Sequence, residues 1–232
     1  MRLAIVGHGR MGRTIASLAT ARGHDIAAVI DEAENADGRA ITRERLAGID
    51  VALEFTTPSA APVNLTRLIE LGVPAVCGTT GWTAELPRIS SLTRERNGAL
   101  VHAPNFSVAV QLFLRAAREL ARRFAGRREF DGFILEHHHA QKVDAPSGTA
   151  RTLQELARTT DPGRAFPITS VRAGAIPGIH SLTYDGPYET VALTHTARSR
   201  DGFAAGALLA AEWLPGRSGV FTFEDVLFGE DR

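Results

Sequence analysis

Residues 136–142, with the sequence EHHHAQK, bring three of the eight histidines together with Lys142, the only lysine of the chain. The other 25 of the 26 basic residues are arginines. An arginine stays charged and cannot donate a proton at neutral pH, whereas a lysine amine or an imidazole can be tuned to do so. The segment therefore indicates proton transfer, although a solvated polar loop would fit the same residues.

A metal site is the rival interpretation of these histidines. On a strand, His137 and His139 would share one face and His138 would lie on the other. Two imidazoles without an assured third ligand make a poor zinc site, and the lone cysteine, Cys77, is remote in sequence. We therefore expect no metal, and a single cysteine also excludes an internal disulfide.

The residues that follow the lysine could hold an anion. The sequence DAPSGTA, residues 144–150, leads into a predicted helix at 148–158. Ser147 can cap that helix while the backbone N–H groups of Gly148 and Thr149 remain free, and such a helix start binds carboxylate or phosphate. An ordinary capped helix would look the same. Beside a lysine and histidines, the pattern favours an anionic substrate.

A second constellation lies at the N-terminus and fits G-x-G-x-x-G through Gly7, His8, Gly9, Arg10, Met11 and Gly12. It follows a predicted strand at 2–6 and opens a predicted helix at 11–22. The first glycine suits a tight turn, the second lets backbone approach a pyrophosphate, and the third allows close helix–strand packing. A dinucleotide site is therefore expected, with a glycine turn that binds nothing as the alternative.

Asp31 lies 19 residues after Gly12, where a carboxylate can accept hydrogen bonds from the adenosine ribose hydroxyls. The same carboxylate would repel a 2′-phosphate, and Glu32 adds to the repulsion. Arg10 and Arg13 could offset it. NADH is therefore moderately preferred over NADPH.

Two further loops follow predicted strands at 74–77 and 100–102, and they contain Gly78, Thr79, Thr80, Ala103, Pro104, Asn105 and Phe106. Ligands of open α/β sheets bind at the carboxyl ends of the strands. These loops could hold the nicotinamide end of the cofactor, or they could be plain connections rich in turn-forming residues.

The framework that must position these residues changes character along the chain. Up to about residue 102, strands at 2–6, 25–30, 51–55, 74–77 and 100–102 alternate with helices at 11–22 and 58–71, which predicts a Rossmann-type parallel α/β sheet. Pro58 suits the first turn of the second helix. Later residues predict a smaller α+β unit with a mainly antiparallel sheet: helices at 108–124 and 148–158, strands at 130–135, 168–171, 179–184 and 190–196, and a final helix at 203–213. The four arginines of helix 108–124 are best explained as a solvated face.

Composition excludes other classes of protein. The 26 basic residues balance 26 acidic ones, and 44% of the residues are hydrophobic. A neutral chain lacks the one-sided field that binding to nucleic acid or to a membrane surface needs. No run of about 18 apolar residues exists, and the apolar N-terminus breaks into glycines after five residues, so a cytoplasmic protein is expected.

Several motifs together resemble one family over nearly the whole length. They are GHGRMGR, EFTTPSA, VCGTTGW, APNFSVAV, EHHHAQKVDAPSGTA, RAGAIPGIH and ALTHTARSR. The chain resembles the 4-hydroxy-tetrahydrodipicolinate reductases, also called dihydrodipicolinate reductases. That resemblance implies NAD(P)H-dependent reduction of a small cyclic dicarboxylate on the route to diaminopimelate and lysine.

The resemblance also implies residue roles. His138 and Lys142 match the catalytic pair, with the proton donor left open between them. His139 matches a substrate contact, and Gly148 with Thr149 the carboxylate-binding pair. Residues 7–12, 31, 78–80 and 103–106 match the cofactor contacts.

The resemblance further implies a dinucleotide-binding domain of residues 1–106 and 199–232, and a substrate-binding and oligomerisation domain of residues 107–198. The last stretch is expected to return to the nucleotide domain, and a homotetramer to assemble through the second sheet. The segment between Asp31 and Val51 is short for the family, and no arginine follows Asp31. Two rivals remain: another two-domain oxidoreductase, which would lack DAPSGTA, and a nucleotide-sensing module, which would not use the histidine–lysine segment.

Overall fold

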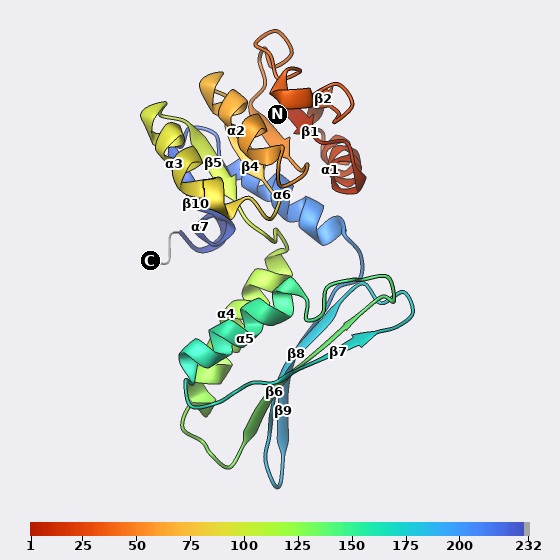
Figure 1. Ribbon diagram of the computed structural model, residues 1–232, viewed down its shortest axis with the longest axis vertical. Coiled ribbons are helices and arrows are strands. Elements are labelled where there is room, and N and C mark those ends of the chain that lie inside the picture. Colours follow the sequence, from red (N-terminus) through yellow and green to blue (C-terminus); the bar gives the residue numbers. More distant parts are fainter. Residues whose placement is uncertain (230–232) are drawn as a thin grey trace. The chain divides into compact units, whose positions relative to one another are not determined.

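A computed structural model describes residues 1–229, which divide into two compact units (Figure 1). Unit 1 comprises Met1–Val108 and residues 201–229, and unit 2, Ala109–Arg200, is inserted between these two stretches. The predicted boundaries, after residues 106 and 198, each lie two residues from those of the units. Within residues 1–229, every helix is too short or too polar to cross a bilayer.

Unit 1 is built on a six-stranded parallel sheet in the order β10-β5-β4-β3-β1-β2. The strands are β1 (Arg2–Val6), β2 (Asp25–Ile30), β3 (Val51–Glu54), β4 (Ala75–Cys77), β5 (Ala99–His102) and β10 (Gly219–Thr222). This confirms the predicted Rossmann-type α/β sheet. The stretch after residue 199 does return to this unit, and it adds β10 as an edge strand that the sequence pattern did not reveal.

Helices cover both faces of this sheet. They are α1 (Arg10–Ala21), α2 (Ala61–Glu70), α3 (Leu86–Glu95), α6 (Asp201–Trp213) and α7 (Phe223–Phe228), with short 3-10 turns η1 (Ala36–Gly38) and η2 (Thr83–Glu85). Because successive residues of a strand point to opposite faces, Leu3 and Ile5 join the cluster that includes α1 and α6. Ala4 and Val6 join the cluster that includes α2 and α3. Burial of both faces explains the continuous apolar runs of these strands.

The helices of unit 1 differ from the predicted ones in two respects. The helix predicted at 58–71 begins at Ala61, so Pro62 rather than Pro58 lies in its first turn, and Thr57 accepts the backbone bonds that start the helix. Helix α3 was not predicted. Its fully buried residues are Ile89, Ser90 and Thr93, and the partly buried Leu86 and Leu92 pack against the same core, so polar residues share the inner face with the apolar ones.

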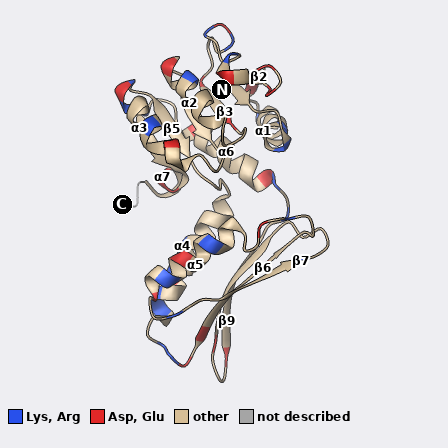
Figure 2. Cartoon of the chain, viewed as in Figure 1, with Lys and Arg blue, Asp and Glu red and all other residues tan. Residues whose placement is uncertain are grey.

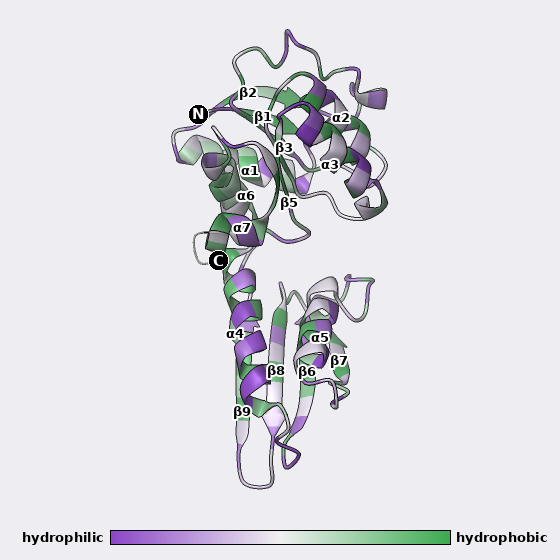
Figure 3. Ribbon diagram, turned by 90° about the vertical axis from the view of Figure 1, so that its left-hand side faces the viewer, coloured by the Kyte–Doolittle hydropathy of each residue, from purple (hydrophilic) through white to green (hydrophobic). Residues whose placement is uncertain are grey.

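Unit 2 packs two helices, α4 (Val108–Phe124) and α5 (Gly148–Thr160), on one face of a four-stranded sheet. The strands are β6 (Asp131–His138), β7 (Ile168–Arg172), β8 (Ile179–Asp185) and β9 (Thr190–Thr196), in the order β7-β6-β8-β9. Two of the three pairings are antiparallel, as expected, whereas β6 and β7 run parallel. Figure 3 shows α4 alternating between hydrophobic and hydrophilic residues, as a helix with one buried face must.

Strand β6 extends three residues beyond its predicted end, because it is paired on both sides up to its last residues. Its residues alternate strictly, with Ile134, Glu136 and His138 buried and the residues between them less so. His138 therefore lies on the face that the helices cover, and His137 on the opposite face. The strand carries polar residues into the interior at its carboxyl end.

Charged residues of both signs are interspersed over both units (Figure 2). On α4, Arg122 and Arg123 both pair with the exposed Glu119, at 2.9 and 2.6 Å. Their pairing agrees with the interpretation of these two arginines as part of a solvated face.

Candidate functional site

In unit 1, the loops after four neighbouring strands are tied to one edge of the sheet by backbone hydrogen bonds. The bonds run from Gly7 N to Ile30 O (2.9 Å), Phe55 N to Val6 O (2.9 Å), Gly78 N to Glu54 O (3.0 Å) and Ala103 N to Cys77 O (3.2 Å). Each links the residue just after one strand to the end of its neighbour. The predicted cofactor segments 7–12, 78–80 and 103–106, together with Asp31, therefore lie along the same edge.

The three glycines of the fingerprint have separate structural reasons. Gly7 has φ +95°, and a Cβ there would lie 2.3 Å from the carbonyl oxygen of Phe55. A Cβ at Gly12 would lie 1.9 Å from the carbonyl oxygen of Gly7, so only glycine allows α1 to pack this closely. At Gly9 a Cβ would meet nothing within 4 Å. The second glycine therefore faces open space.

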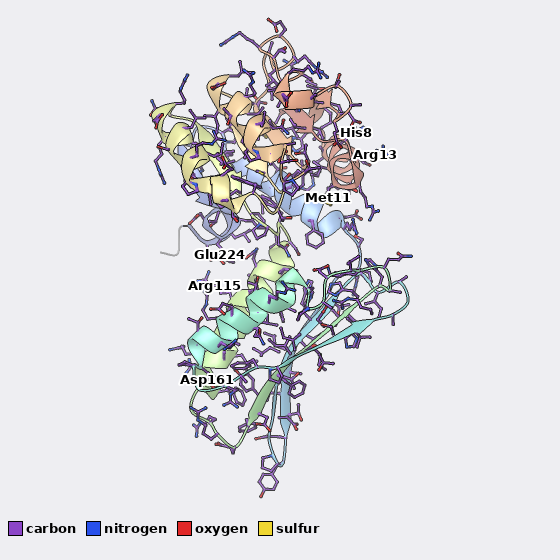
Figure 4. All side chains as sticks on the ribbon, viewed as in Figure 1. His8, Met11, Arg13, Arg115, Asp161 and Glu224 are labelled. Carbon is purple, nitrogen blue, oxygen red and sulfur yellow. The ribbon has the colours of Figure 1, made fainter. Side chains whose placement is uncertain are left out.

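Gly9 is also the N-cap of α1, and it has no side chain with which to cap the first N–H groups of the helix. Unpaired N–H groups and the positive end of the helix dipole make such a start an anion site. Arg13 Nε donates to the His8 carbonyl at 3.0 Å, and Figure 4 labels His8, Met11 and Arg13 at this end of α1. The fingerprint thus fits a pyrophosphate.

Asp31 is exposed immediately after β2. A neighbouring carboxylate, Glu34, accepts hydrogen bonds from Asp31 N at 3.3 Å and from Arg45 Nη2 at 2.9 Å. The bond from Arg45 lowers the pKa of Glu34. Arg45 also donates to the carbonyl of Val29 at 2.7 Å, so its cation is already engaged near this corner. Sequence reasoning had singled out neither Glu34 nor Arg45.

A buried carboxyl group, Glu54, lies at the end of β3 behind these loops and is 0% exposed. Oε2 accepts from the Thr79 hydroxyl at 2.6 Å and the Cys77 thiol at 3.2 Å. Oε1 accepts from the Asn64 amide at 3.2 Å and from the Thr56 hydroxyl. Burial raises the pKa of Glu54, although these donors oppose the change. All of its partners are neutral.

Glu54 clamps two loops of the cofactor edge together. Thr79 Oγ1, which donates to Glu54, also accepts from Thr56 N at 2.8 Å. Thr79 is therefore turned inward, as is Phe106, which is 2% exposed and packs with Phe55 and Phe223. A cofactor could therefore contact these two predicted residues through their backbone groups but not through their side chains. Thr80 and Pro104 are exposed.

In unit 2, His138 is buried at the end of β6 with a defined set of neighbours. Its Nδ1 is hydrogen-bonded to the Glu136 carboxylate. The ring of His180 packs against its edge, with 5.1 Å between centroids and 71° between planes. Burial lowers the pKa of His138, the bond to Glu136 opposes this, and the nearby Lys142 and Arg172 cations lower it further.

Glu136 is 0% exposed and joins three elements. Oε1 accepts from Arg172 Nη2 of β7 at 2.6 Å and from Ser147 N at the start of α5 at 3.3 Å, and Oε2 bonds to His138. Burial alone would raise the pKa of Glu136. The hydrogen bonds from Arg172, Ser170 and His138 outweigh burial and lower the pKa to about 2. Glu136 is therefore ionised at neutral pH.

The start of α5 has the capped geometry that the sequence predicts. Ser147 Oγ accepts from Ala150 N at 3.2 Å, which confirms it as the N-cap, and it is also hydrogen-bonded to His180 Nε2 at 3.0 Å. The N–H groups of Gly148 and Thr149 belong to the first turn, where a helix offers no backbone acceptor. Gly148 is exposed and a Cβ there would meet nothing within 4 Å.

Lys142 and His139 lie in the turn between β6 and α5. Lys142 Nζ donates to Asp144 Oδ1 at 2.7 Å, and this bond lowers the pKa of Asp144. The carbonyl of His139 accepts from Lys142 N at 3.1 Å. The buried Nδ1 of His139 has no hydrogen-bond partner within residues 1–229. Arg172 Nη2 holds the turn through the carbonyl of Asp144 at 2.7 Å.

The same cluster could be mistaken for a metal centre. In the described part of the chain, ligand atoms of Glu136, His138 and His180 lie within 4.8 Å of one another. The Arg172 guanidinium already donates a hydrogen bond to Glu136, and its positive charge would repel a divalent cation. The Ser147 hydroxyl is hydrogen-bonded to His180. The donors are arranged to hold an imidazole rather than an ion.

Sequence reasoning missed Glu136, Arg172 and His180 as site residues. Glu136 was visible in the motif EHHHAQK, two residues from His138 and on the same face of a strand. Arg172 and His180 reach the site only through pairing: Arg172 lies opposite His138 in the parallel β6–β7 register, and His180 lies opposite Glu136 in β8.

A parallel sheet with a glycine fingerprint, in one chain with a unit that presents a paired histidine, a lysine and an open helix start, defines a two-domain NAD(P)H-dependent oxidoreductase. Residues 1–106 match the family described as dihydrodipicolinate reductase, N-terminus, and residues 109–227 match dihydrodipicolinate reductase, C-terminus. The chain belongs to the dihydrodipicolinate reductase family.

Relatives match most or nearly all of the chain. A 4-hydroxy-tetrahydrodipicolinate reductase of Christiangramia forsetii is 36% identical, covering 98% of each chain. Another, of Methanopyrus kandleri, is 38% identical over 79% of this chain and 73% of its own. A solved structure of a dipicolinate-bound dihydrodipicolinate reductase from Paenisporosarcina sp. has a TM-score of 0.81 at 24% identity, covering 96% of this chain and 97% of that one. That structure shows the same fold.

Proposed function

We propose that the protein reduces 4-hydroxy-tetrahydrodipicolinate to tetrahydrodipicolinate with NADH or NADPH, in the route to diaminopimelate and lysine. The match of both halves of the chain to one reductase family carries this proposal. No observation favours a nucleotide-sensing module, because the histidine, lysine and open helix start of unit 2 would then have no use. The cytoplasmic location expected from the sequence belongs to the same proposal.

The proposed cofactor site is the edge of the unit 1 sheet, and it consists of Gly7, His8, Gly9, Arg10, Met11, Gly12, Asp31, Gly78, Thr79, Thr80, Ala103, Pro104, Asn105 and Phe106. The open side of Gly9 and the uncapped start of α1 support a pyrophosphate there. A moderate preference for NADH rests on the exposed carboxylate of Asp31 and on the pairing of Arg45 with Glu34. An engaged arginine is less able to bind a 2′-phosphate.

The proposed chemistry of unit 2 is proton donation beside a bound dicarboxylate. Loss of the substrate hydroxyl as water would leave an unsaturated imine, and the reduced dinucleotide, when bound, would supply a hydride to ring C4 of that imine. The N–H groups of Gly148 and Thr149 bind a substrate carboxylate, and His139 contributes a further contact. His138 or Lys142 donates the proton to the adjacent ring carbon. Such general acid catalysis typically contributes about 10²–10⁴-fold to the rate.

A homotetramer formed through the sheet of unit 2 is also part of the proposal. The helices of that unit cover only one face of the sheet. Phe133, Leu135 and His137 lie on the other face and are half-buried, and no helix of unit 2 within the described residues packs there. Light scattering of the purified protein tests this, and a monomer at micromolar concentration would contradict it.

An enzyme assay tests the proposed reaction. The substrate is generated in the assay from pyruvate and aspartate semialdehyde by the preceding synthase, and absorbance at the NADH band is followed. We expect oxidation of NADH, and slower oxidation of NADPH, that depends on all components. No oxidation of either cofactor would reject the proposal.

A further inference from the structure

We propose that Glu136 is a positioning residue that holds His138 with its proton on Nδ1 and makes Nε2 the atom that exchanges a proton with the substrate. The inference rests on the proposed role of His138 in the reaction. It adds what neither the motif nor the family match states: which ring nitrogen works, and which side chain decides this.

The two oxygens of Glu136 have unequal partners, and this inequality fixes the carboxylate. Oε1 receives two N–H donors, Arg172 Nη2 at 2.6 Å and Ser147 N at 3.3 Å. One donor comes from β7 and the other from the start of α5, so the group cannot rotate without losing both. On the other side of the carboxylate, Oε2 bonds to Nδ1 of His138. Since an ionised carboxylate only accepts hydrogen bonds, Nδ1 must carry the proton.

The other ring nitrogen is left without a competing partner. His138 Nε2 makes no hydrogen bond within residues 1–229, whereas Nδ1 is committed to Glu136. The residue beside Nε2 is Gly178, where a Cβ would lie 3.1 Å from the nitrogen. His180 packs against the ring, and its own Nε2 is bonded to Ser147. The ring is thus held by a hydrogen bond at Nδ1, and its Nε2 is left for the substrate.

Charge around the ring points the same way. The groups that face it are Glu136 from β6, Lys142 and Asp144 from the following turn, Arg172 from β7 and His180 from β8. Burial lowers the pKa of His180 to about 4, so it is neutral near pH 7. Of the carboxylates, Asp144 bonds to Lys142, and only Glu136 touches the ring. Glu136 is therefore the group that stabilises the imidazolium form an acid catalyst needs.

Substitution of Glu136 by glutamine inverts this arrangement. In Glu136→Gln, the amide oxygen must face the two N–H donors on the Oε1 side, because Arg172 and Ser147 N cannot accept. The amide NH₂ then points at His138 Nδ1, which must accept and cannot also hold a proton. We expect kcat to fall by roughly 100-fold and the alkaline limb of its pH profile to move to lower pH. The KM for NADH should not change. Glu136→Asp, which restores the charge, should recover part of kcat and the original limb.

The tautomer of His138 can also be measured directly, without an activity assay. Nitrogen NMR of protein labelled with ¹⁵N-histidine, with the His138 signals assigned through His138→Gln, should show the neutral ring protonated on Nδ1 in the wild type and on Nε2 in Glu136→Gln. Glu155→Gln, at an exposed position of α5, is the matched control and should leave both spectrum and kinetics unchanged.

The outcomes separate the two proposals. A wild-type ring protonated on Nε2 would overturn the inference, and this measurement needs no variant to fold. A loss of kcat in Glu136→Gln with an unmoved pH profile would also overturn it and leave Glu136 a structural residue. The expected tautomers in a wild type that does not consume the dicarboxylate would instead reject the proposed reaction.

Discussion

Among residues 1–229, each unit buries one glutamate completely, and the two are held in opposite ways. Glu54 lies among a thiol, an amide and two hydroxyls, all neutral, whereas Glu136 lies between a guanidinium and an imidazole. Both are 0% exposed. Burial raises the pKa of Glu54, while the charged partners of Glu136 lower its pKa to about 2.

The difference shows that burial alone does not decide the charge of a carboxyl group; its partners do. Neutral donors make Glu54 a clamp between two loops of the cofactor edge. Charged donors make Glu136 a permanent anion beside a histidine. In unit 1 the buried glutamate thus holds two loops together, whereas in unit 2 it holds His138, the proposed acid. Four measurements can break or sharpen this comparison.

The largest effect should come from the histidine that Glu136 holds. His138→Ala should lower kcat by about 10²–10⁴-fold, because it removes the proposed acid. The affinity for NADH, measured by fluorescence titration, should stay the same, since the proposed cofactor residues are in unit 1. Glu155→Ala, at an exposed position of α5, is the control. Equal losses in both variants would contradict the assignment.

The next largest effect should be the difference in stability between removing the charged partner of Glu136 and removing a neutral partner of Glu54. Arg172→Met should lower the free energy of unfolding by about 3 kcal/mol, because it leaves Glu136 buried without its cation. Thr79→Val, which removes a neutral donor from Glu54, should cost only about 1 kcal/mol. Urea unfolding measures both, with the exposed Arg151→Met as a control within about 0.5 kcal/mol. If Thr79→Val proved the costlier, the contrast between the two glutamates would fail.

The pH dependence of stability should have opposite signs at the two sites. Glu136 has a depressed pKa, so its contribution is present above the ordinary value of 4.5 and is lost as pH falls toward about 2. Glu54 has a raised pKa, so its folded form binds a proton that the unfolded chain has released, and stability falls as pH rises above 4.5.

Unfolding measured between about pH 3 and pH 8 checks these signs. Glu136→Gln should be less stable than the wild type at neutral pH, and this difference should shrink as the solution becomes more acid. Glu54→Gln should gain stability as the solution becomes more alkaline. Parallel curves for the two variants would show that the two carboxyl groups do not differ.

The smallest effect should come from an exposed carboxylate. Asp31→Asn should shift the ratio of kcat/KM for NADPH over NADH upward by about fivefold, roughly 1 kcal/mol, because solvent screens a surface charge. Steady-state kinetics with both cofactors measure this ratio. Glu95→Gln, exposed on α3, should leave it unchanged. An unaltered ratio in Asp31→Asn would show that Asp31 does not discriminate between NADH and NADPH.

What the sequence could predict was local. The fingerprint glycines, the Ser147 cap and the opposite faces of His137 and His138 all follow from patterns within a few residues. The structure confirms the cap, the two faces of β6 and the steric need for the first and third glycines, while cofactor binding stays a prediction. The parallel sheet followed from alternating strands and helices. Helix α3 was missed because its ten residues carry only three large apolar side chains, Leu86, Ile89 and Leu92, among mostly polar ones.

What the sequence could not predict depends on pairing between distant strands. The parallel register of β6 with β7 brings Arg172 opposite His138, 34 residues away in the chain. No local pattern encodes that pairing, and an antiparallel neighbour would have presented a different residue. The roles of Glu54 likewise depend on loops from β3 and β4 meeting at one edge.

The insertion of unit 2 between residues 108 and 201 has a thermodynamic consequence. If unit 2 unfolded by itself, its 92 residues would become a closed loop of the still-folded unit 1, at an entropic cost of about 4 kcal/mol. The two units are therefore coupled, and the coupling is reciprocal: a folded unit 1 opposes unfolding of the insert, and an intact insert spares unit 1 the cost of closing a long loop.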